Sequence, residues 1–156
     1  MTSEERIKRQ KEMVEVAGRF YDKKGMQPIA GRILGLLIVM DKEQFTFDEI
    51  VEELQISKSS ASNALRLLEL ADSVEYITLP GDRKRYFQLK KRDKYALIDE
   101  HRVTLSGTRD YLKLVLSLKA NKLSGNALFI ENMIGMLDFY IEKFEELKKE
   151  YDRSNK

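Results

Sequence analysis

The sequence predicts a mostly α-helical protein with one small β-hairpin, the winged helix-turn-helix arrangement, between long helices at its two ends. Apolar residues recur at the spacing of amphipathic helices over most of the 156 residues. In residues 74–89, apolar and polar residues alternate on both sides of a turn, which is typical of a hairpin. Two short helical patterns joined by a tight turn stand before that hairpin.

Composition indicates one globular domain, or one domain with an appended element. Hydrophobic residues make up 42% and charged residues 35%, enough for a core. The chain has no cysteine and one histidine, which excludes a disulfide framework and argues against a zinc site. The start of the chain mixes charges, unlike a signal peptide, and "ILGLLIVM" is far shorter than the roughly 20 residues that span a bilayer. We expect a cytoplasmic protein without a cofactor or a membrane segment.

The first two helices are predicted over residues 3–24 and 28–40. The first carries an apolar face and ends at Gly25, as a left-handed cap would end it. The second begins at Pro28 and is apolar nearly all round, which indicates burial. Gly31 and Gly35 leave one stripe of this helix without side chains, so another helix can approach closely. The same spacing serves in membrane dimers, but Arg32 and the short run favour packing in a water-soluble core.

The helix-turn-helix is predicted over residues 47–71. We read "DKEQF" as a loop, and Thr46 with Glu49 forms a capping box for a helix at residues 47–54. "QIS" is a tight turn, and Ser57 is a suitable N-cap for the next helix. In that helix an apolar stripe at Ala61, Leu65 and Leu68 faces inward. The polar residues pointing away from the stripe are Lys58, Ser59, Ser60, Ser62, Asn63 and Arg66.

The hairpin follows as a strand at residues 74–79, the loop "PGDRKR" and a return strand "YFQLK". We expect Ile77 and Leu79 on one face of the first strand, and Phe87 and Leu89 facing the core from the second. Pro80 and Gly81 are turn residues. The tip of this wing is strongly cationic.

The remaining residues are predicted to form two long helices, at residues 92–119 and 127–152. The last helix carries apolar residues at alternating steps of three and four, an unbroken heptad seam. The seam consists of Ile130, Met133, Leu137, Tyr140, Phe144, Leu147 and Tyr151. Its partner is either the preceding helix folded back or a second copy of the chain. We divide the chain into an N-terminal helix for dimerisation (residues 1–27), a winged helix-turn-helix (28–92) and a helical dimerisation region (93–156).

Charge is distributed unevenly along the chain. Residues 57–92 contain eight Lys and Arg against four acids, whereas residues 126–152 contain seven acids and three lysines. A basic central segment and an acidic C-terminal segment are consistent with one surface that binds a polyanion. A run of charged residues can also be an ordinary solvated surface.

The polar face of the second motif helix fits the DNA major groove. A helix in this position presents its N-terminal residues to base edges, and free N–H groups at its start attract phosphate. Asn63 can pair with adenine, and Arg66 or Lys58 with guanine. The wing would place Arg83, Lys84 and Arg85 on the flanking groove or backbone. Each element alone also fits a capped surface helix and a plain hairpin; their order and spacing together favour DNA. The predicted DNA-binding residues are Ser57, Lys58, Ser59, Ser60, Ser62, Asn63, Arg66, Arg83, Lys84 and Arg85.

Three elements make the chain resemble the MarR-type winged-helix transcriptional regulators, in particular their GbsR-like branch. They are "GRI.GLL", "ISK.S.S..LR.LE" and "PG.RK.Y", within about 65 continuous residues. The resemblance implies homodimeric repressors or activators joined through long terminal helices, with the recognition helix at residues 58–71 and the wing tip at 81–85. The chain departs from the family pattern at Ala71-Asp72-Ser73, where a glycine turn is usual, and at Glu75, where a basic residue is more usual.

Some members of that branch are thought to sense choline-like ligands, which an aromatic cage could bind. The available aromatic residues are Phe20, Tyr21, Tyr95, Tyr111, Phe129, Phe139 and Tyr140. Packing in a core or dimer explains them equally well. His101 could line a pocket with Thr104 and Thr108, or lie on a surface. A small-molecule effector is therefore an open expectation.

The sequence thus predicts a homodimeric transcriptional regulator that binds a near-palindromic double-stranded DNA site. We expect no enzyme, because the sequence contains no nucleophile elbow, phosphate-binding glycine loop or metal-ligand cluster. The alternative is a winged helix that binds proteins instead of DNA. The basic and polar exposed face of the second motif helix favours DNA.

Overall fold

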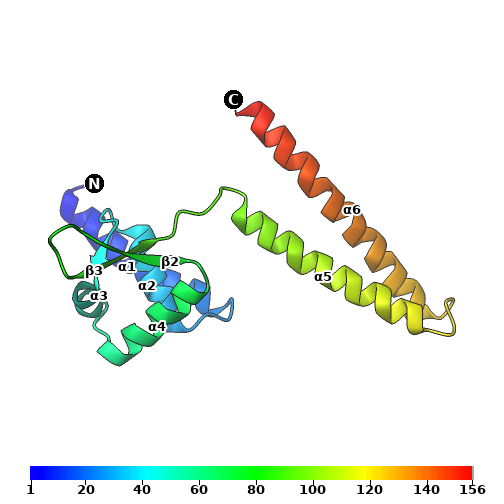
Figure 1. Cartoon of the computed structure of the whole chain (residues 1–156), viewed down its shortest axis with the longest axis horizontal. Helices are drawn as coiled ribbons and strands as arrows, with labels where there is room; N and C mark the ends of the chain where they lie inside the picture. Colours follow the sequence, from blue (N-terminus) through cyan, green and yellow to red (C-terminus); the bar gives the residue numbers. More distant parts are fainter. Residues whose placement is uncertain (156) are drawn as a thin grey trace. The chain divides into compact units, whose positions relative to one another are not determined.

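The computed structural model describes residues 1–155 and divides into two compact units (Figure 1). The first unit is Met1–Lys91, and the second begins at Arg92. Most of the chain is helical, with one three-stranded antiparallel sheet in the first unit. The predicted fold class is therefore confirmed. Among the described residues, none of the helices is long and apolar enough to cross a membrane.

Helix α1 (Ser3–Asp22) packs against helix α2 (Pro28–Val39) in the first unit. A capping box of Thr2 and Glu5 begins α1. The helix ends two residues earlier than predicted, and Gly25 then takes the left-handed conformation, at φ +85°, that reverses the chain. Helix α2 is buried along most of its length, as its nearly uniform apolar sequence predicts.

Two glycines allow α1 and α2 to approach closely. A Cβ atom added to Gly35 would lie 2.6 Å from the Cβ of Ala17, and one added to Gly31 would lie 3.0 Å from the Cβ of Tyr21. Any larger residue would separate the helices. The predicted close approach of another helix at this stripe is confirmed, and that helix is α1.

Helices α3 (Phe47–Leu54) and α4 (Lys58–Leu70) form the predicted helix-turn-helix. Thr46 and Glu49 cap the first helix reciprocally, and the Ser57 hydroxyl accepts the Ser60 N–H at the start of the second. Between them Gln55 adopts a left-handed conformation, at φ 50°. The inward stripe of α4 is buried. These caps and this stripe are as the sequence predicts.

The sheet has the strand order β1-β3-β2, with β1 at Phe45–Thr46, β2 at Val74–Thr78 and β3 at Arg85–Leu89. Strand β1 begins inside "DKEQF", so the prediction of a loop there was wrong at Phe45. Two residues are too few to show an alternation. Phe45 is buried and pairs with Phe87 across the sheet.

The prediction for the second strand of the hairpin is confirmed, because Phe87 and Leu89 face the core. Their cross-strand partners are Tyr76 and Val74. Cross-strand partners share a face, so Ile77, which pairs with Tyr86, lies on the opposite side. Leu79 lies beyond β2 and is exposed. Val74 at the base of the hairpin closes the core.

The second unit consists of α5 (Ala96–Leu118) and α6 (Gly125–Ser154), which pack against each other. Ser124 caps α6, and its hydroxyl accepts the Ala127 N–H. No residue of α5 is buried, and the buried residues of α6 are Ala127, Ile134 and Phe144. The preceding helix therefore covers only part of the seam.

Candidate nucleic-acid interface

The start of α4 is organised around one serine hydroxyl. The Ser57 Oγ accepts the Ser60 N–H at 3.1 Å and donates to the Ser60 Oγ at 2.8 Å, and it lies 3.1 Å from the Ser59 Oγ. The cap therefore engages these three hydroxyls. Lys58 is highly exposed and lies 3.6 Å from Asp48 of α3, an ion pair that contributes little in water.

The outer face of α4 is polar and exposed. Ser62, Asn63 and Arg66 lie on it, whereas Ala61, Ala64 and Leu65 are buried behind it. The structure thus places the predicted base-reading residues on the face opposite the core. Ser60 differs from the others because it is half-buried in the cap.

The tip of the wing is held by Asp82. One carboxylate oxygen accepts the Lys84 N–H at 2.9 Å, and the other accepts the Tyr86 hydroxyl at 2.7 Å. The first of these bonds contributes most to lowering the pKa of Asp82, and the bond to Asp82 raises the pKa of Tyr86. Gly81 supplies the left-handed turn, at φ +80°. The wing is therefore an ordered turn that leaves Arg83, Lys84 and Arg85 exposed.

A groove of about 510 Å³ lies between α4 and the wing. Arg66 and Ser62 line it from the helix, and Lys84 and Arg85 from the hairpin. The Arg85 guanidinium lies 4.5 Å from the ring centroid of Tyr76, a cation–π contact that orients it. The structure thus brings two predicted residues of the helix and two of the wing to one groove, which the carboxylates of Asp48 and Glu69 also line. The other predicted DNA-binding residues, Asn63 among them, lie outside its lining. The contact of Tyr76 with Arg85, and the bonds by which Asp82 holds the tip, could not be found from the sequence.

The two departures from the family pattern have structural counterparts. Asp72 takes a left-handed conformation, at φ 56°, and Lys90 pairs with its carboxylate. Aspartate tolerates this conformation better than most residues, so the turn forms without glycine. Glu75 accepts the Gln88 side-chain amide at 2.9 Å, and Gln88 accepts that of Gln44 at 3.0 Å. Glu75 is thus part of a polar ladder across the sheet.

The residues of the predicted α6 seam differ in burial within the single chain. Phe144 is buried at 9% exposure, and Ile130 and Leu137 are half-buried. Tyr140, Leu147 and Tyr151 are each more than half exposed, and Met133 is at 36%. Large apolar residues of α5 are also exposed, among them Leu97, Val103, Tyr111, Leu114 and Leu118. The helical hairpin therefore leaves a wide apolar surface in water.

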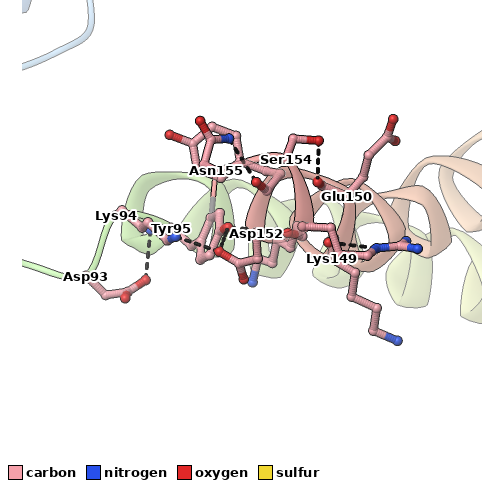
Figure 2. Close-up of polar contacts among 11 residues, drawn as sticks. Asp93, Lys94, Tyr95, Lys149, Glu150, Asp152, Ser154 and Asn155 are labelled. Carbon is pink, nitrogen blue, oxygen red and sulfur yellow. Dashed lines mark hydrogen bonds and ion pairs between the residues drawn. The ribbon is translucent and has the colours of Figure 1, made fainter.

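Polar and aromatic contacts fasten the last turns of α6 to the start of α5 (Figure 2). Asp152 accepts hydrogen bonds from the Lys94 ammonium at 2.6 Å and the Tyr95 hydroxyl at 2.8 Å. The Lys94 Nζ also lies 4.8 Å and 5.1 Å from the ring centroids of Tyr95 and Tyr151. These contacts raise the pKa of Lys94, chiefly through the bond to Asp152. The rings of Tyr95 and Tyr151 thus contact the ammonium group of Lys94, a residue of the same chain. An aromatic cage for an effector remains a prediction.

The lone histidine, His101, is exposed on α5. The ring of His101 lies edge-on to that of Phe144, at 6.4 Å between centroids. No group of His, Cys, Asp and Glu that could hold a metal ion occurs within residues 1–155.

Comparison with known proteins identifies relatives of the first unit. The MarR family model matches residues 24–85, from the end of α1 to the wing. The HTH-type transcriptional regulator MmpR5 of Mycobacterium tuberculosis is 33% identical over 79 residues, which are 51% of this chain and 48% of that protein. The chain thus matches about half the length of this curated relative.

One solved structure supports the same fold over more of the chain. A crystal structure of a transcriptional regulator superposes with a TM-score of 0.68 at 23% identity, covering 91% of this chain and 97% of that chain. A mutant of MepR from S. aureus, solved with an oligodeoxyribonucleotide, aligns loosely, with a TM-score of 0.43 at 21% identity over 83% and 90% of the two chains. The first likeness shows that the two chains share a fold.

Proposed function

We propose that this chain, whose residues 24–85 match the MarR family model, is a sequence-specific DNA-binding transcriptional regulator that acts as a homodimer. The observation that carries the proposal is the groove between α4 and the wing. Exposed groups suited to base edges and phosphates line both of its sides. We expect no enzymatic activity.

In the proposed complex, α4 lies in the major groove and the wing contacts the flanking groove or backbone. Asn63 and Arg66 are the residues suited to read bases, because amide and guanidinium groups can each pair with two base atoms. Arg83, Lys84 and Arg85 supply affinity that depends on salt and little on sequence. Asp82 fixes the tip so that these cations need less ordering on binding.

The homodimer is proposed from the exposed apolar surface of the second unit. An isolated two-helix hairpin buries one stripe of each helix, and here several large side chains remain in water. A second copy offers the same surface, so a two-fold axis would cover both. Two recognition helices would then bind half-sites roughly 34–36 Å apart, one turn of DNA.

The test is selection of bound sequences from a random duplex pool, followed by binding of variants. The proposal predicts a near-palindromic site. Asn63→Ala and Arg66→Ala should each weaken specific binding by about 1–3 kcal/mol, with a much smaller effect on non-specific DNA. Arg9→Ala, at an exposed arginine on α1, is the matched control. A pool without enrichment would contradict the proposal and favour a protein-binding winged helix.

A further inference from the structure

Arg32 links three helices of the first unit. It lies on α2 within the "GRI.GLL" element. Its Nε and Nη2 donate to one carboxylate oxygen of Glu15 on α1, at 2.9 and 2.7 Å. The same Nη2 also donates to the backbone carbonyl of Leu54 at 3.0 Å, at the last residue of α3.

The room for this side chain is made by Gly18. A Cβ atom at position 18 would lie 2.7 Å from the Cγ of Arg32. Any residue other than glycine at this position would therefore displace the aliphatic part of the arginine side chain. The Arg32 side chain is only 25% exposed. The guanidinium is therefore confined between α1 and the end of α3.

The carbonyl that Arg32 reaches is at a critical point of the motif. The last carbonyls of a helix lack partners within it and carry the negative end of its dipole, so a cation there is favourable. Helix α3 has no basic residue in its own last turn. Gln55 follows immediately in its left-handed conformation, and Ser57 caps α4 two residues later. Arg32 thus holds the end of α3 from which the recognition helix departs.

We infer that Arg32 is a positioning residue for DNA recognition, which sets the helix-turn-helix turn relative to α1 through Glu15 and the Leu54 carbonyl. The inference rests on the proposed function for its consequence in DNA binding. A lysine at this position would lose the Nε donor to Glu15, because one ammonium group lacks the two-nitrogen fork that Arg32 places on this carboxylate oxygen. A second bridge, from Lys11 to Glu53 at 3.1 Å, joins the same two helices nearby.

The test measures amide hydrogen exchange of the full chain without DNA, and then DNA binding. The Ile56 N–H donates to the Val51 carbonyl across the turn and reports its opening. In Arg32→Lys and in Glu15→Gln, exchange at Ile56 should be about fivefold faster, because one charge-assisted bond is lost. The double variant should add little to Arg32→Lys, since both changes remove the same link.

The control is Arg6→Gln, which breaks the 3.5 Å ion pair of Arg6 and Asp41 between α1 and the segment after α2 without touching α3. Exchange at Ile56 should not change in it. Affinity for the selected duplex should fall in the Arg32 and Glu15 variants by a factor similar to the change in exchange, and stay constant in the control.

Unchanged exchange at Ile56, or an equal rise throughout residues 1–91, would overturn the inference. Loss of local protection with unaltered affinity for the selected duplex would overturn it as well. If the wild type selects no duplex, the proposed function fails separately, and local protection in the two variants still decides whether Arg32 positions the turn.

Discussion

The first and second units bury apolar side chains to very different extents. In the first, α2 is buried along most of its length, and the buried faces of α4, β3 and Phe45 close around it. In the second, α5 has no buried residue and α6 has Ala127, Ile134 and Phe144. Helices and sheets become stable by covering each other's apolar faces, and two helices offer few faces. The first unit has its own core, whereas the second needs another surface to complete one.

The largest expected effect comes from charging the exposed part of the seam. Tyr140→Glu with Leu147→Glu should leave the first unit folded and disrupt association, because glutamates at a buried interface must lose their hydration. DNA affinity should fall by about a hundredfold or more, since each half-site would bind alone. Sedimentation and binding to the selected duplex measure both effects.

The matched control for this variant is Lys149→Glu. At about 100° per residue, position 149 lies on the opposite side of α6 from Tyr140 and Leu147. It changes the charge of the same helix without touching the seam. If it dissociates the protein equally, net charge and not the apolar surface governs association.

A substitution at the α1–α2 contact should affect the first unit alone. Gly35→Ala places a methyl group 2.6 Å from that of Ala17, so the helices must separate. We expect a loss of about 1–3 kcal/mol in the free energy of unfolding of this unit. Gly107→Ala, where nothing lies within 4 Å of the added atom, is the control. Denaturant unfolding, monitored by amide hydrogen exchange in each unit, would measure the stability of the two units separately. An equal loss of stability in both units would contradict their independence.

Removing the N-cap of the recognition helix should have a smaller effect. Ser57→Ala deletes the acceptor of the Ser60 N–H and should cost about 1 kcal/mol. Fraying at the start of α4 should be visible as faster amide exchange there, with little change in α6. Ser57→Asp, which retains a capping oxygen, should restore protection; failure to do so would show that the hydroxyl cluster acts in another way.

The smallest expected effect is a pH dependence of the wing. The pKa of Asp82 is lowered from its ordinary 3.8, mainly by the Lys84 N–H, so the ionised form favours the ordered tip. Its contribution is present above the ordinary value and is lost as pH falls through the lower folded one. NMR titration of Lys84 and Tyr86 should report this change, and Asp82→Asn should abolish it. A tip that stays ordered through the transition would contradict the role of Asp82.

Much of the first unit could be predicted because its signals are local. The capping box of Thr46 and Glu49 and the cap at Ser57 depend on residues three apart. Strand β1 could not be predicted, because two residues acquire their role only by pairing with β3. The sequence also left open which face of β2 points to the core, since the register of a hairpin decides which side faces inward.

The residues proposed to contact DNA could be predicted from the sequence, but the residues that hold them in place could not. Exposed residues of α4 followed from the position of its apolar stripe. Tyr76 beneath Arg85 and Arg32 at the end of α3 could not be found, because each joins elements that are distant in the sequence. The seam of α6 was recognised as apolar. Its period alone could not show which of its residues pack against α5 and which remain exposed.

We propose that a second copy of the chain completes the second unit and that the pair binds DNA. The most direct test is the mass of the wild-type protein in solution at micromolar concentration, alone and with the selected duplex. We expect twice the mass of one chain, and two chains on each near-palindromic duplex. A protein that sediments as one chain, and binds the same duplex tightly as one chain, would contradict it.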